Sequence, residues 1–471
     1  MSQKPRSPLL PIFLIVLVDV LGFTIVIPLL AFYAEKFGAS PLVATTLVSV
    51  YAVCSLVSTP IIGNLSDRFG RRRLLLVSQA GTCLGFLMLA WSHALWMVFL
   101  GRILDGITAG NLSLAQAYIS DHTKPENRAK AFGVIGVAFG IGFMFGPGIG
   151  GLLGKYGLHV PFLVAASLSL LSIIATATLL KNEIPGQDAP PAEAVAEGQP
   201  PAGRRPGAFD ISTYVEYFRR PRLGNLYLQF FLFTFAFSCF TSGFALFAER
   251  RFTTTQELRR ADDDPCQFAF TRRVAPDTHA VVYADREPIE LVHISKDGKR
   301  IELDGPSCEH VRNAQHMSAV LPWTAREVGI LFTFSGLLGI LLQGGLIGRL
   351  VKRFGERPLV LAGFASSCIG YFALGQTYTL AMLAVVTVFA SFGNGVLRPV
   401  ITSLITQVAG RKEQGIALGI SGSLSSFAMC LAPPTGGALL EGHHLMLWAC
   451  VPGVTYVIGF VVALAGRKPT S

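Results

Sequence analysis

The stretch GNLSDRFGRR, from Gly63 to Arg72, lies between two apolar blocks and sets an Asp and three Arg beside two glycines. A weaker copy, GRLVKRFGER, runs from Gly348 to Arg357, with Gly, Leu, Arg, Phe, Gly and Arg at the same places. At the same offset, to within one residue, AFGVIG at 131–136 aligns with ALGISG at 417–422. The chain therefore contains two copies of one unit, each about half its length.

The sequence around these copies is too apolar for a soluble protein. Of 471 residues, 51% are hydrophobic and 14% are charged, where a soluble chain carries roughly a quarter charged residues. The apolar residues form blocks of about 20, long enough for a helix to cross roughly 30 Å of hydrocarbon. This excludes a soluble enzyme and predicts an all-α membrane protein with twelve transmembrane helices in two six-helix repeats. The predicted spans are 9–32, 41–62, 74–91, 95–119, 131–153, 160–180, 226–247, 328–350, 359–376, 380–405, 416–440 and 445–465.

The distribution of Lys and Arg predicts the orientation in the membrane. They gather in one set of loops, while the opposite short loops hold only Lys36 and Lys155. Because twelve is even, both termini lie on one side, and the positive-inside rule places them in the cytoplasm. The net charge of +10 is then explained by the Lys and Arg residues of the cytoplasmic loops, and no nucleic-acid partner is expected. We expect a multi-pass protein of an inner or plasma membrane, with the lipid bilayer as its environment.

Two polar stretches divide the chain. Residues 182–208 are rich in Pro, Ala and Gly without aromatics, a composition typical of a flexible linker. The mixed aromatic and basic segment after it, 209–222, is typical of an amphipathic helix at the membrane surface. The expected parts are a six-helix bundle (1–181), a cytoplasmic linker with an amphipathic tail (182–223), the seventh helix (224–249), an insertion (250–323) and the rest of the second bundle (324–471).

The insertion should be extracytoplasmic and contain β structure, since its place after the seventh span puts it outside. Residues 289–294 and 300–303 flank an Asp-Gly turn, which predicts a β-hairpin. Cys266 and Cys308 lie on either side of it, and in an oxidising compartment they can form a disulfide, or they stay two free thiols. The partner of this 250–323 module is unknown.

The repeated loop resembles the G-x-L-a-D-r-x-G-r-[KR] signature between the second and third spans of the major facilitator superfamily. That resemblance implies a transporter in which Asp and Arg residues latch the cytoplasmic side shut and release it when the halves rock. An alternative is a solvated loop that only orients the protein. The residues concerned are Gly63, Asp67, Arg68, Gly70, Arg71 and Arg72.

The fifth span holds a second pattern, GFMFGPGIGG, which resembles the G-x-x-x-G-P-x-x-G-G motif of antiporters in that superfamily. Small residues let helices approach closely, and a proline kinks the span, which would seal the pathway against leak. The motif favours efflux over uptake, and its residues are Gly142, Gly146, Pro147, Gly150 and Gly151.

Ionisable residues inside the spans are few and costly, so each one predicts a function. Asp19 lies in a stretch similar to the first span of tetracycline-type drug:proton antiporters. Arg102 matches a fourth-span Arg implicated in proton coupling, and Asp105, three residues on, lies on the same helix face. Burial and a nearby Arg shift a carboxylate's proton affinity in opposite directions, so rocking can switch it. Structural ion pairing is the alternative, and for Asp105 the two readings stand level.

Three residues are candidates for the substrate cavity. Asn394 and Arg398 lie in the tenth predicted span, and Phe240 belongs to an aromatic run in the seventh. In the alternative interpretation Arg398 pairs with backbone carbonyls, and the aromatic run is ordinary lipid-facing sequence. No phosphate-binding loop, nucleophile elbow or metal-ligand spacing occurs, so neither an enzyme nor a metal or other cofactor is expected, and the proton gradient is the energy source.

The resemblance is closest to the tetracycline-resistance branch and covers the chain except the linker and the insertion, which that branch lacks. We expect a monomeric secondary transporter that exports a lipophilic, drug-like or tetracycline-like small molecule in exchange for protons, by alternating access. One alternative is a proton-coupled importer of a metabolite or sugar. Another is a receptor that uses the external module; deleting 253–317 would abolish its ligand response but spare the proton-coupled flux of a transporter.

Overall fold

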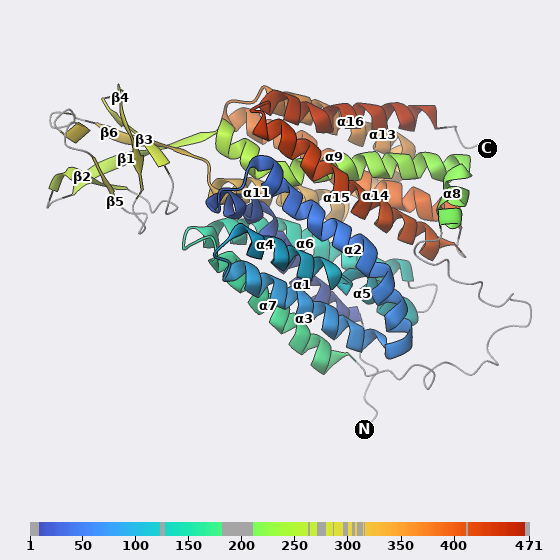
Figure 1. Cartoon of the computed structure of the whole chain (residues 1–471). Coiled ribbons are helices and arrows are strands. Elements are labelled where there is room, and N and C mark those ends of the chain that lie inside the picture. The colour runs from blue at the N-terminus through green and yellow to red at the C-terminus, as the bar shows by residue number, and fades with distance from the viewer. Residues whose placement is uncertain are drawn as a thin grey trace, which may run out of the picture.

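The computed structural model is helical along each of the twelve predicted spans and carries one sheet (Figure 1). It describes residues 9–122, 128–180, 211–261, 264–270, 279–285, 287–294, 300–303, 307–308, 314, 316–410 and 413–466. The first half comprises α1 (Leu9–Lys36), α2 (Pro41–Phe69), α3 (Arg71–Ala90), α4 (Leu95–Ile107), α5 (Asn111–His122), α6 (Arg128–Gly154) and α7 (Val160–Leu179). The second comprises α8 (Ile211–Arg219), α9 (Pro221–Arg251), α11 (Ala325–Leu341), α12 (Ile347–Phe354), α13 (Glu356–Gly375), α14 (Leu380–Ala409), α15 (Gln414–Glu441) and α16 (Leu445–Ala465).

Within these ranges, nine helices are long and apolar enough to cross a membrane by length and composition: α1, α2, α3, α7, α9, α13, α14, α15 and α16. The remaining predicted spans are helical but differ in form. One is α6, one is α4 followed by α5, and one is α11, which continues through a π-helical turn, Leu342–Leu346, into α12.

The prediction of one unbroken span over 95–119 was wrong, because the helix stops at Ile107 and restarts at Asn111. Side chains of neighbouring helices satisfy the backbone groups freed at the break. Ser58 donates to the carbonyl of Gly106 at 2.7 Å, Thr59 donates to that of Ala109 at 2.9 Å, and Ser78 accepts from the Gly110 amide at 2.9 Å. Such replacement bonds make a broken helix tolerable at membrane depth.

The internal duplication is visible in matching local contacts. Gly70 and Gly355, which share a place in the two copies, both adopt positive φ (92° and 83°) between consecutive helices, a backbone conformation that glycine accepts at little cost. Arg72 at the start of α3 donates to the Ala177 carbonyl near the end of α7. Arg357 at the start of α13 likewise donates to carbonyls at the end of α16. The repeated Arg therefore ties the third span of each half to the last span of that half.

The helices gather into two bundles, one from each half of the chain, and the sheet projects from one end (Figure 1). The halves meet mainly through α6 against α11 and α2 against α15. We call the end with the sheet and residues 37–40 the sheet end, and the end with 63–72 and 348–357 the motif end. Helices α1 and α16 begin and finish, respectively, at the motif end.

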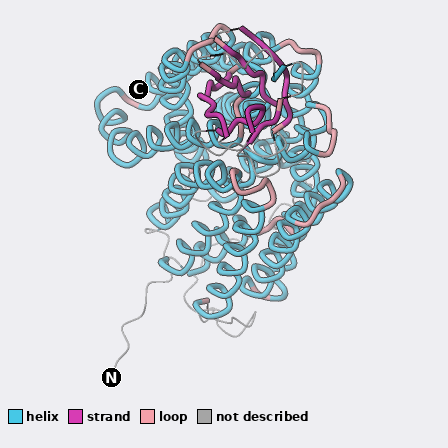
Figure 2. Tube along the Cα trace, turned by 90° about the vertical axis from the view of Figure 1, so that its left-hand side faces the viewer, coloured by secondary structure: helices cyan, strands magenta, loops and turns pink. Residues whose placement is uncertain are grey.

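The insertion is a six-stranded antiparallel sheet that, seen from its own end, covers part of the bundle (Figure 2). Its strands are β1 (Thr253–Ala261), β2 (Asp264–Phe270), β3 (His279–Ala284), β4 (Glu287–His293), β5 (Arg300–Glu302) and β6 (Met317–Pro322), in the order β4-β3-β6-β1-β2-β5. Alternate side chains such as Phe268, Val282 and Ala319 form its apolar core. In this structure a disulfide joins Cys266 and Cys308.

The predicted hairpin across the Asp-Gly sequence was wrong. Strand β4 pairs with β3, and β5 pairs with β2, so the two predicted partners lie at opposite ends of the strand order. The hairpin turn lies instead at Asp285, whose φ is 46°. The Asp-Gly sequence itself falls in 295–299, outside the described residues. A turn signal predicts reversal of the chain, but the pairing is set by which apolar faces bury together.

Candidate functional site

The three predicted coupling residues lie in the first half, where Arg102 contacts Asp105 and Asp19 lies within electrostatic range of Asp105. Arg102 Nη1 lies 2.8 Å from Asp105 Oδ2, with the two side chains only 3% and 6% exposed. The Arg102 guanidinium carbon lies 4.4 Å from the ring centroid of Tyr51 on α2. The pair is therefore desolvated, and its charges interact far more strongly than they would in water.

Glycines bring α4 close enough to its neighbours to bury this pair. A Cβ at Gly85 of α3 would lie 3.0 Å from Asp105 Cβ and from the Gly101 carbonyl oxygen. A Cβ at Gly106 would lie 2.6 Å from Cys54 Cβ on α2. Larger side chains at these places would force the helices apart. The glycines therefore allow the close helix packing that buries the ion pair.

Asp19 of α1 borders the same region through a narrow recess lined also by Thr82, Ala165 and Ser169. Its polar neighbours are Gln79 on α3 and Ser172 on α7, whose side chains bond to each other at 2.8 Å. The Asp19 Oδ1 atom is buried and has no hydrogen-bond partner among the described residues. A buried carboxylate oxygen in this position can hold and release a proton.

The sequence did not single out Tyr51, Gln79 or Ser172 as parts of this cluster. They are uncharged polar residues on three different helices, α2, α3 and α7, which also carry other Ser and Thr residues. A Gln in the middle of an apolar block was the available signal, because its amide needs partners inside the membrane.

The glycines of the predicted antiporter motif are divided between two faces of α6. Gly142, Gly146 and Gly150 are spaced by four residues and pack on α1, where Thr24 donates to the Gly142 carbonyl at 2.9 Å. Gly148 and Gly151 pack on α11 of the other half. A Cβ at Gly151 would lie 2.5 Å from the Ala325 carbonyl oxygen. Pro147 is buried between these two sets of contacts. Through its glycines, the motif packs α6 against both α1 and α11.

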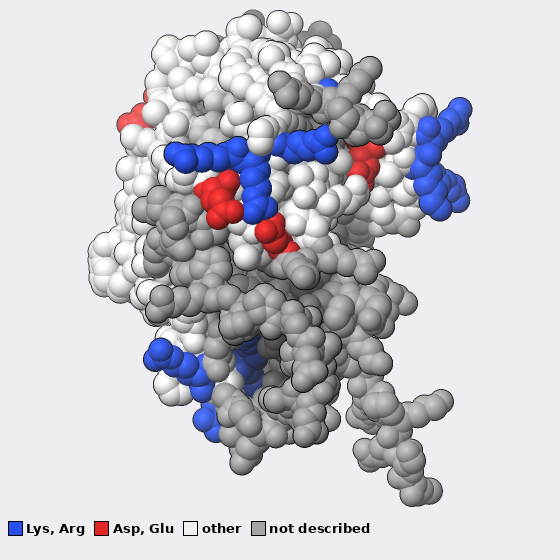
Figure 3. Space-filling view, turned by 90° about the vertical axis from the view of Figure 1, so that its right-hand side faces the viewer, with Lys and Arg blue, Asp and Glu red and all other residues white. Residues whose placement is uncertain are grey.

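The predicted gating loop lies at the motif end. Arg71 contacts the Ser66 hydroxyl and Arg72 the end of α7, while Arg68 is exposed. The side chain of Asp67 lies outside the described residues. A Cβ at Gly63 would have nothing within 4 Å. Among the described residues, more Lys and Arg than Asp and Glu are visible on this end of the molecule (Figure 3). The exposed cations near these loops and helix ends are Arg68, Arg73, Arg219, Arg222, Arg349, Lys352 and Arg353.

The halves touch closely at the sheet end. Glu35 of α1 and Arg250 of α9 form an ion pair at 2.7 Å, and Ser40 donates to Glu441 Oε2 at 3.0 Å between α2 and α15. Toward the motif end the glycines of the same helices, including Gly63, Gly419 and Gly422, have open space where a Cβ would be. The structure is thus closed at the sheet end and looser at the motif end.

A second polar cluster lies in the other half. Asn394 of α14 donates to the Tyr371 hydroxyl at 3.2 Å and accepts from the Tyr456 hydroxyl at 2.8 Å. The two tyrosine rings stack with centroids 5.3 Å apart, and the Phe240 centroid lies 5.1 Å from that of Tyr371. The structure thus brings Asn394 and Phe240 together around tyrosines that the sequence did not single out.

Arg398 follows Asn394 by one helical turn and is exposed. At about 100° per residue, it lies roughly opposite Val385 and Phe389, which are exposed on the outer, apolar side of α14. Of the three cavity candidates, Arg398 is the exposed one, and it lies on the side of α14 away from these apolar residues.

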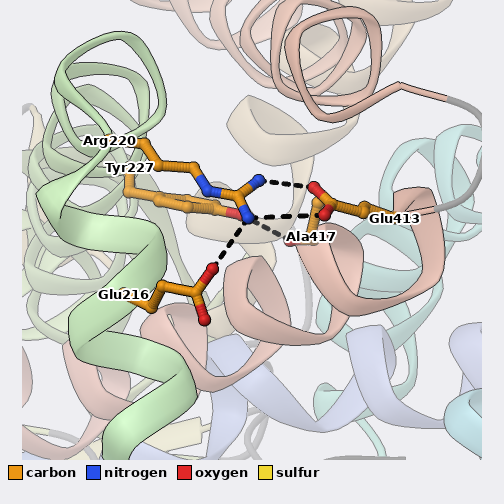
Figure 4. Close-up of polar contacts among 5 residues, drawn as sticks. All are labelled: Glu216, Arg220, Tyr227, Glu413 and Ala417. Carbon is orange, nitrogen blue, oxygen red and sulfur yellow. Dashed lines mark hydrogen bonds and ion pairs between the residues drawn. The ribbon is translucent and has the colours of Figure 1, made fainter. Parts of the chain in front are cut away.

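At the motif end, Arg220 holds α8 against the start of α15 (Figure 4). Its guanidinium bonds Glu413 at 2.5 and 3.3 Å and Glu216 at 2.8 Å, and these hydrogen bonds, first the one to Glu413, raise the pKa of Arg220 above its usual value. Tyr227 donates to the Ala417 carbonyl at 3.4 Å. The predicted amphipathic segment is thus helical over Ile211–Arg219 and attached to the second bundle.

Comparisons with known proteins give a consistent result. The sequence model of the family described as Major Facilitator Superfamily matches residues 12–256 and 312–471, leaving out most of the sheet. The chain is 26% identical over 470 residues to the tetracycline resistance protein, class C, of Escherichia coli, covering 98% of this chain and 96% of that protein. It is 24% identical over 452 residues to multidrug resistance protein 1 of Bacillus subtilis (strain 168), covering 95% and 93%.

Solved structures share the fold. The human organic anion transporter MFSD10 (TETRAN) superposes with a TM-score of 0.64 at 19% identity, covering 98% of this chain and all of that chain (100%). The nucleoside transporter NupG superposes with a TM-score of 0.61 at 14% identity, covering 98% of each chain.

Proposed function

The chain belongs to the major facilitator superfamily, and from this membership we propose that it exports a lipophilic, drug-like small molecule in exchange for protons. It is an integral multi-pass membrane protein and a secondary transporter of small molecules, not an enzyme. The proposed exchange for protons, the export direction and the resemblance of the substrate to tetracyclines go beyond that membership.

The observation that carries the proposal is the buried cluster of Asp19, Arg102 and Asp105. A chain that only bound a ligand would have no need for two carboxylates and an arginine at membrane depth, where each costs at least a few kcal/mol. Asp19 Oδ1 is buried without a described partner, so taking up a proton there supplies a neutral group in place of an unpaired charge. Asp105 is already paired with Arg102 at 2.8 Å, which favours Asp19 as the residue that binds the proton.

The cycle we propose follows from the contacts between the halves. With the sheet end closed and the motif end looser, substrate enters from the motif end, which we place in the cytoplasm because its exposed charges are mainly basic. Rocking then breaks the Glu35–Arg250 pair and opens the sheet end, where substrate leaves and a proton reaches Asp19. The protonated carrier then returns, and Asp19 releases its proton at the motif end, which completes the exchange.

The remaining predictions belong to the same proposal. The twelve helical stretches form twelve spans, both termini are cytoplasmic, the protein acts as a monomer, and the sheet lies outside the membrane on the far side. The glycines of α6 that resemble the antiporter motif, two of which pack on α11, support export over a metabolite or sugar importer.

The test uses everted membrane vesicles energised to an acidic interior, with a pH-sensitive dye and a panel of drugs that includes tetracyclines. We expect drug-dependent proton release from the native protein and none from Asp19→Asn. Glu257→Gln, which changes an exposed acid on β1, is the matched control and should behave as native. Release that survives in Asp19→Asn would move the coupling role to Asp105, and no release with any drug would contradict drug export.

A further inference from the structure

The two halves carry different sets of charged residues at membrane depth, with two carboxylates and one arginine in the first half and one arginine in the second. In the described helices of the first half, Asp19 lies in the middle of α1, and the buried pair Arg102 and Asp105 lies near the break between α4 and α5. In the described helices of the second half, Arg398 is the one charged side chain that lies away from the helix ends. An intramembrane charge on an interior face predicts a functional contact, and here that charge is positive.

The helix face that carries Arg398 is polar over several turns. Ser391, Asn394 and Arg398 are spaced by three and four residues, so they lie on one side of α14. Ser391 bonds Ser335 of α11 at 2.7 Å, and Asn394 is held by Tyr371 and Tyr456. These hydrogen bonds hold in place the two turns of α14 that precede Arg398. The segment of helix that carries the guanidinium is therefore rigid.

A π-helical turn in α11 places a second polar group beside it. The turn, Leu342–Leu346, contains Gln343, which is exposed. Gly395, three residues before Arg398, faces this turn, and a Cβ there would lie 4.0 Å from Gln343 Nε2. Such turns often mark functional sites because they redirect the side chains of one helical turn. The Gln343 amide therefore lies beside the turn of α14 that bears Arg398.

We propose that Arg398 and Gln343 recognise an acidic group on the transported molecule, which makes the substrate an amphiphilic organic anion, or a zwitterion, with a carboxylate or enolate at one end. A guanidinium with a neighbouring amide N–H offers the planar donors that such a group accepts. The half-buried rings of Phe240 and Phe332, with centroids 6.1 Å apart, supply apolar surface on α9 and α11 for the body of the molecule. This inference rests on the proposed function, because it takes the space between the halves as the substrate site.

The division of charge gives the two halves separate tasks. The acidic cluster of the first half handles the proton, and the basic group of the second half holds the anion. No carboxylate is needed on the substrate side, so anion binding and proton binding need not compete for one residue. Removal of Arg398 should then change which molecules bind without removing proton uptake at Asp19.

The test measures equilibrium binding of two probes that share a xanthene scaffold, anionic fluorescein and cationic rhodamine 123, to the purified full-length protein in lipid nanodiscs. We expect the native protein to bind fluorescein more tightly than rhodamine 123. Arg398→Gln should weaken fluorescein binding about tenfold or more, as expected for loss of a charge-assisted bond, and leave rhodamine 123 within about twofold. Arg398→Lys keeps the charge and should fall between native and Arg398→Gln.

Gln343→Leu is a second variant, in an exposed side chain, that should weaken fluorescein binding selectively without affecting folding. Equal weakening of both probes, no weakening by either variant, or a native protein that fails to bind fluorescein or prefers rhodamine 123 would overturn the inference. Asp19→Asn should keep the preference for fluorescein. Charge-selective binding without proton release in the vesicle assay would therefore contradict the proposed antiport and support this inference.

Discussion

At the scale of single residues, the Arg102–Asp105 pair is an ion pair almost completely buried between helices. The spacing of three residues predicts that the two side chains can meet, and the structure adds that both are almost completely buried. A buried pair contributes little net stability as a pair, but loss of one partner leaves an uncompensated charge in a site without water.

We therefore predict that Arg102→Met and Asp105→Asn each lower the free energy of unfolding by about 3–5 kcal/mol. The double variant should regain most of that loss, because no single charge stays buried. Thermal unfolding of the purified protein in detergent measures all three variants against the native chain. Single variants as stable as the native protein would show that the pair is not desolvated.

Sequence reasoning could predict the charged members of this cluster but not its neutral ones. A charge inside an apolar block is rare and costly, so Asp19, Arg102 and Asp105 are conspicuous. Tyr51, Gln79 and Ser172 carry no such cost when they bond to one another, and only the packing of α2, α3 and α7 brings them together. The same holds for Tyr371 and Tyr456 around Asn394 in the other half.

At the scale of elements, α6 is one of the helices that join the halves toward the sheet end. Its Gly151 is packed against the Ala325 carbonyl of α11, so a Cβ there has no room, whereas a Cβ at Gly140 on the same helix would meet its nearest atom at 3.7 Å. Gly151→Ala should separate α6 from α11 and let protons leak through substrate-free proteoliposomes. Gly140→Ala is the matched control and should leak no faster than the native protein; equal leak from both variants would contradict the seal.

The attachment of α8 makes a second prediction at this scale. Arg220→Ala removes the bonds to Glu413 and Glu216 and should release α8 from the start of α15. Because these groups are partly exposed, we expect a modest effect of about 1 kcal/mol. Hydrogen exchange of the first turn of α15 should quicken roughly fivefold for Arg220→Ala and stay unchanged for Arg222→Ala, the control at an exposed neighbour. Unchanged exchange in Arg220→Ala would mean that other contacts hold α8.

The helices were the easiest elements to predict, because an apolar block of about 20 residues usually forms a transmembrane helix in a bilayer. The break between α4 and α5 was not predicted, since Ser58, Thr59 and Ser78, which make it tolerable, are distant in sequence. Strand pairing in the insertion failed for the same reason. The turn at Asp285 and the pairing of β3 with β6 depend on long-range burial rather than on local turn residues.

At the scale of the whole molecule, two repeated halves meet along α6–α11 and α2–α15 and are bound most closely at the sheet end. The repeat itself could be predicted from the two related loops, and the matching contacts of Arg72 and Arg357 reproduce it in three dimensions. The sequence could not predict which end of the molecule is closed, because closure depends on contacts such as Ser40–Glu441, between residues 401 positions apart.

Alternating access requires the sheet end to open in each cycle, so a covalent lock there should stop transport. Ser40→Cys and Glu441→Cys, in a background whose six unpaired cysteines are replaced by Ala, can be joined by a short bis-methanethiosulfonate reagent across the halves. The matched control joins Ser403→Cys and Glu356→Cys, a pair bonded at 2.8 Å within the second half. Drug-dependent proton release in vesicles is then measured before and after joining. We expect the lock between the halves to abolish release, a reductant to restore it, and the control pair to retain it. Release that continues with the halves locked would contradict alternating access.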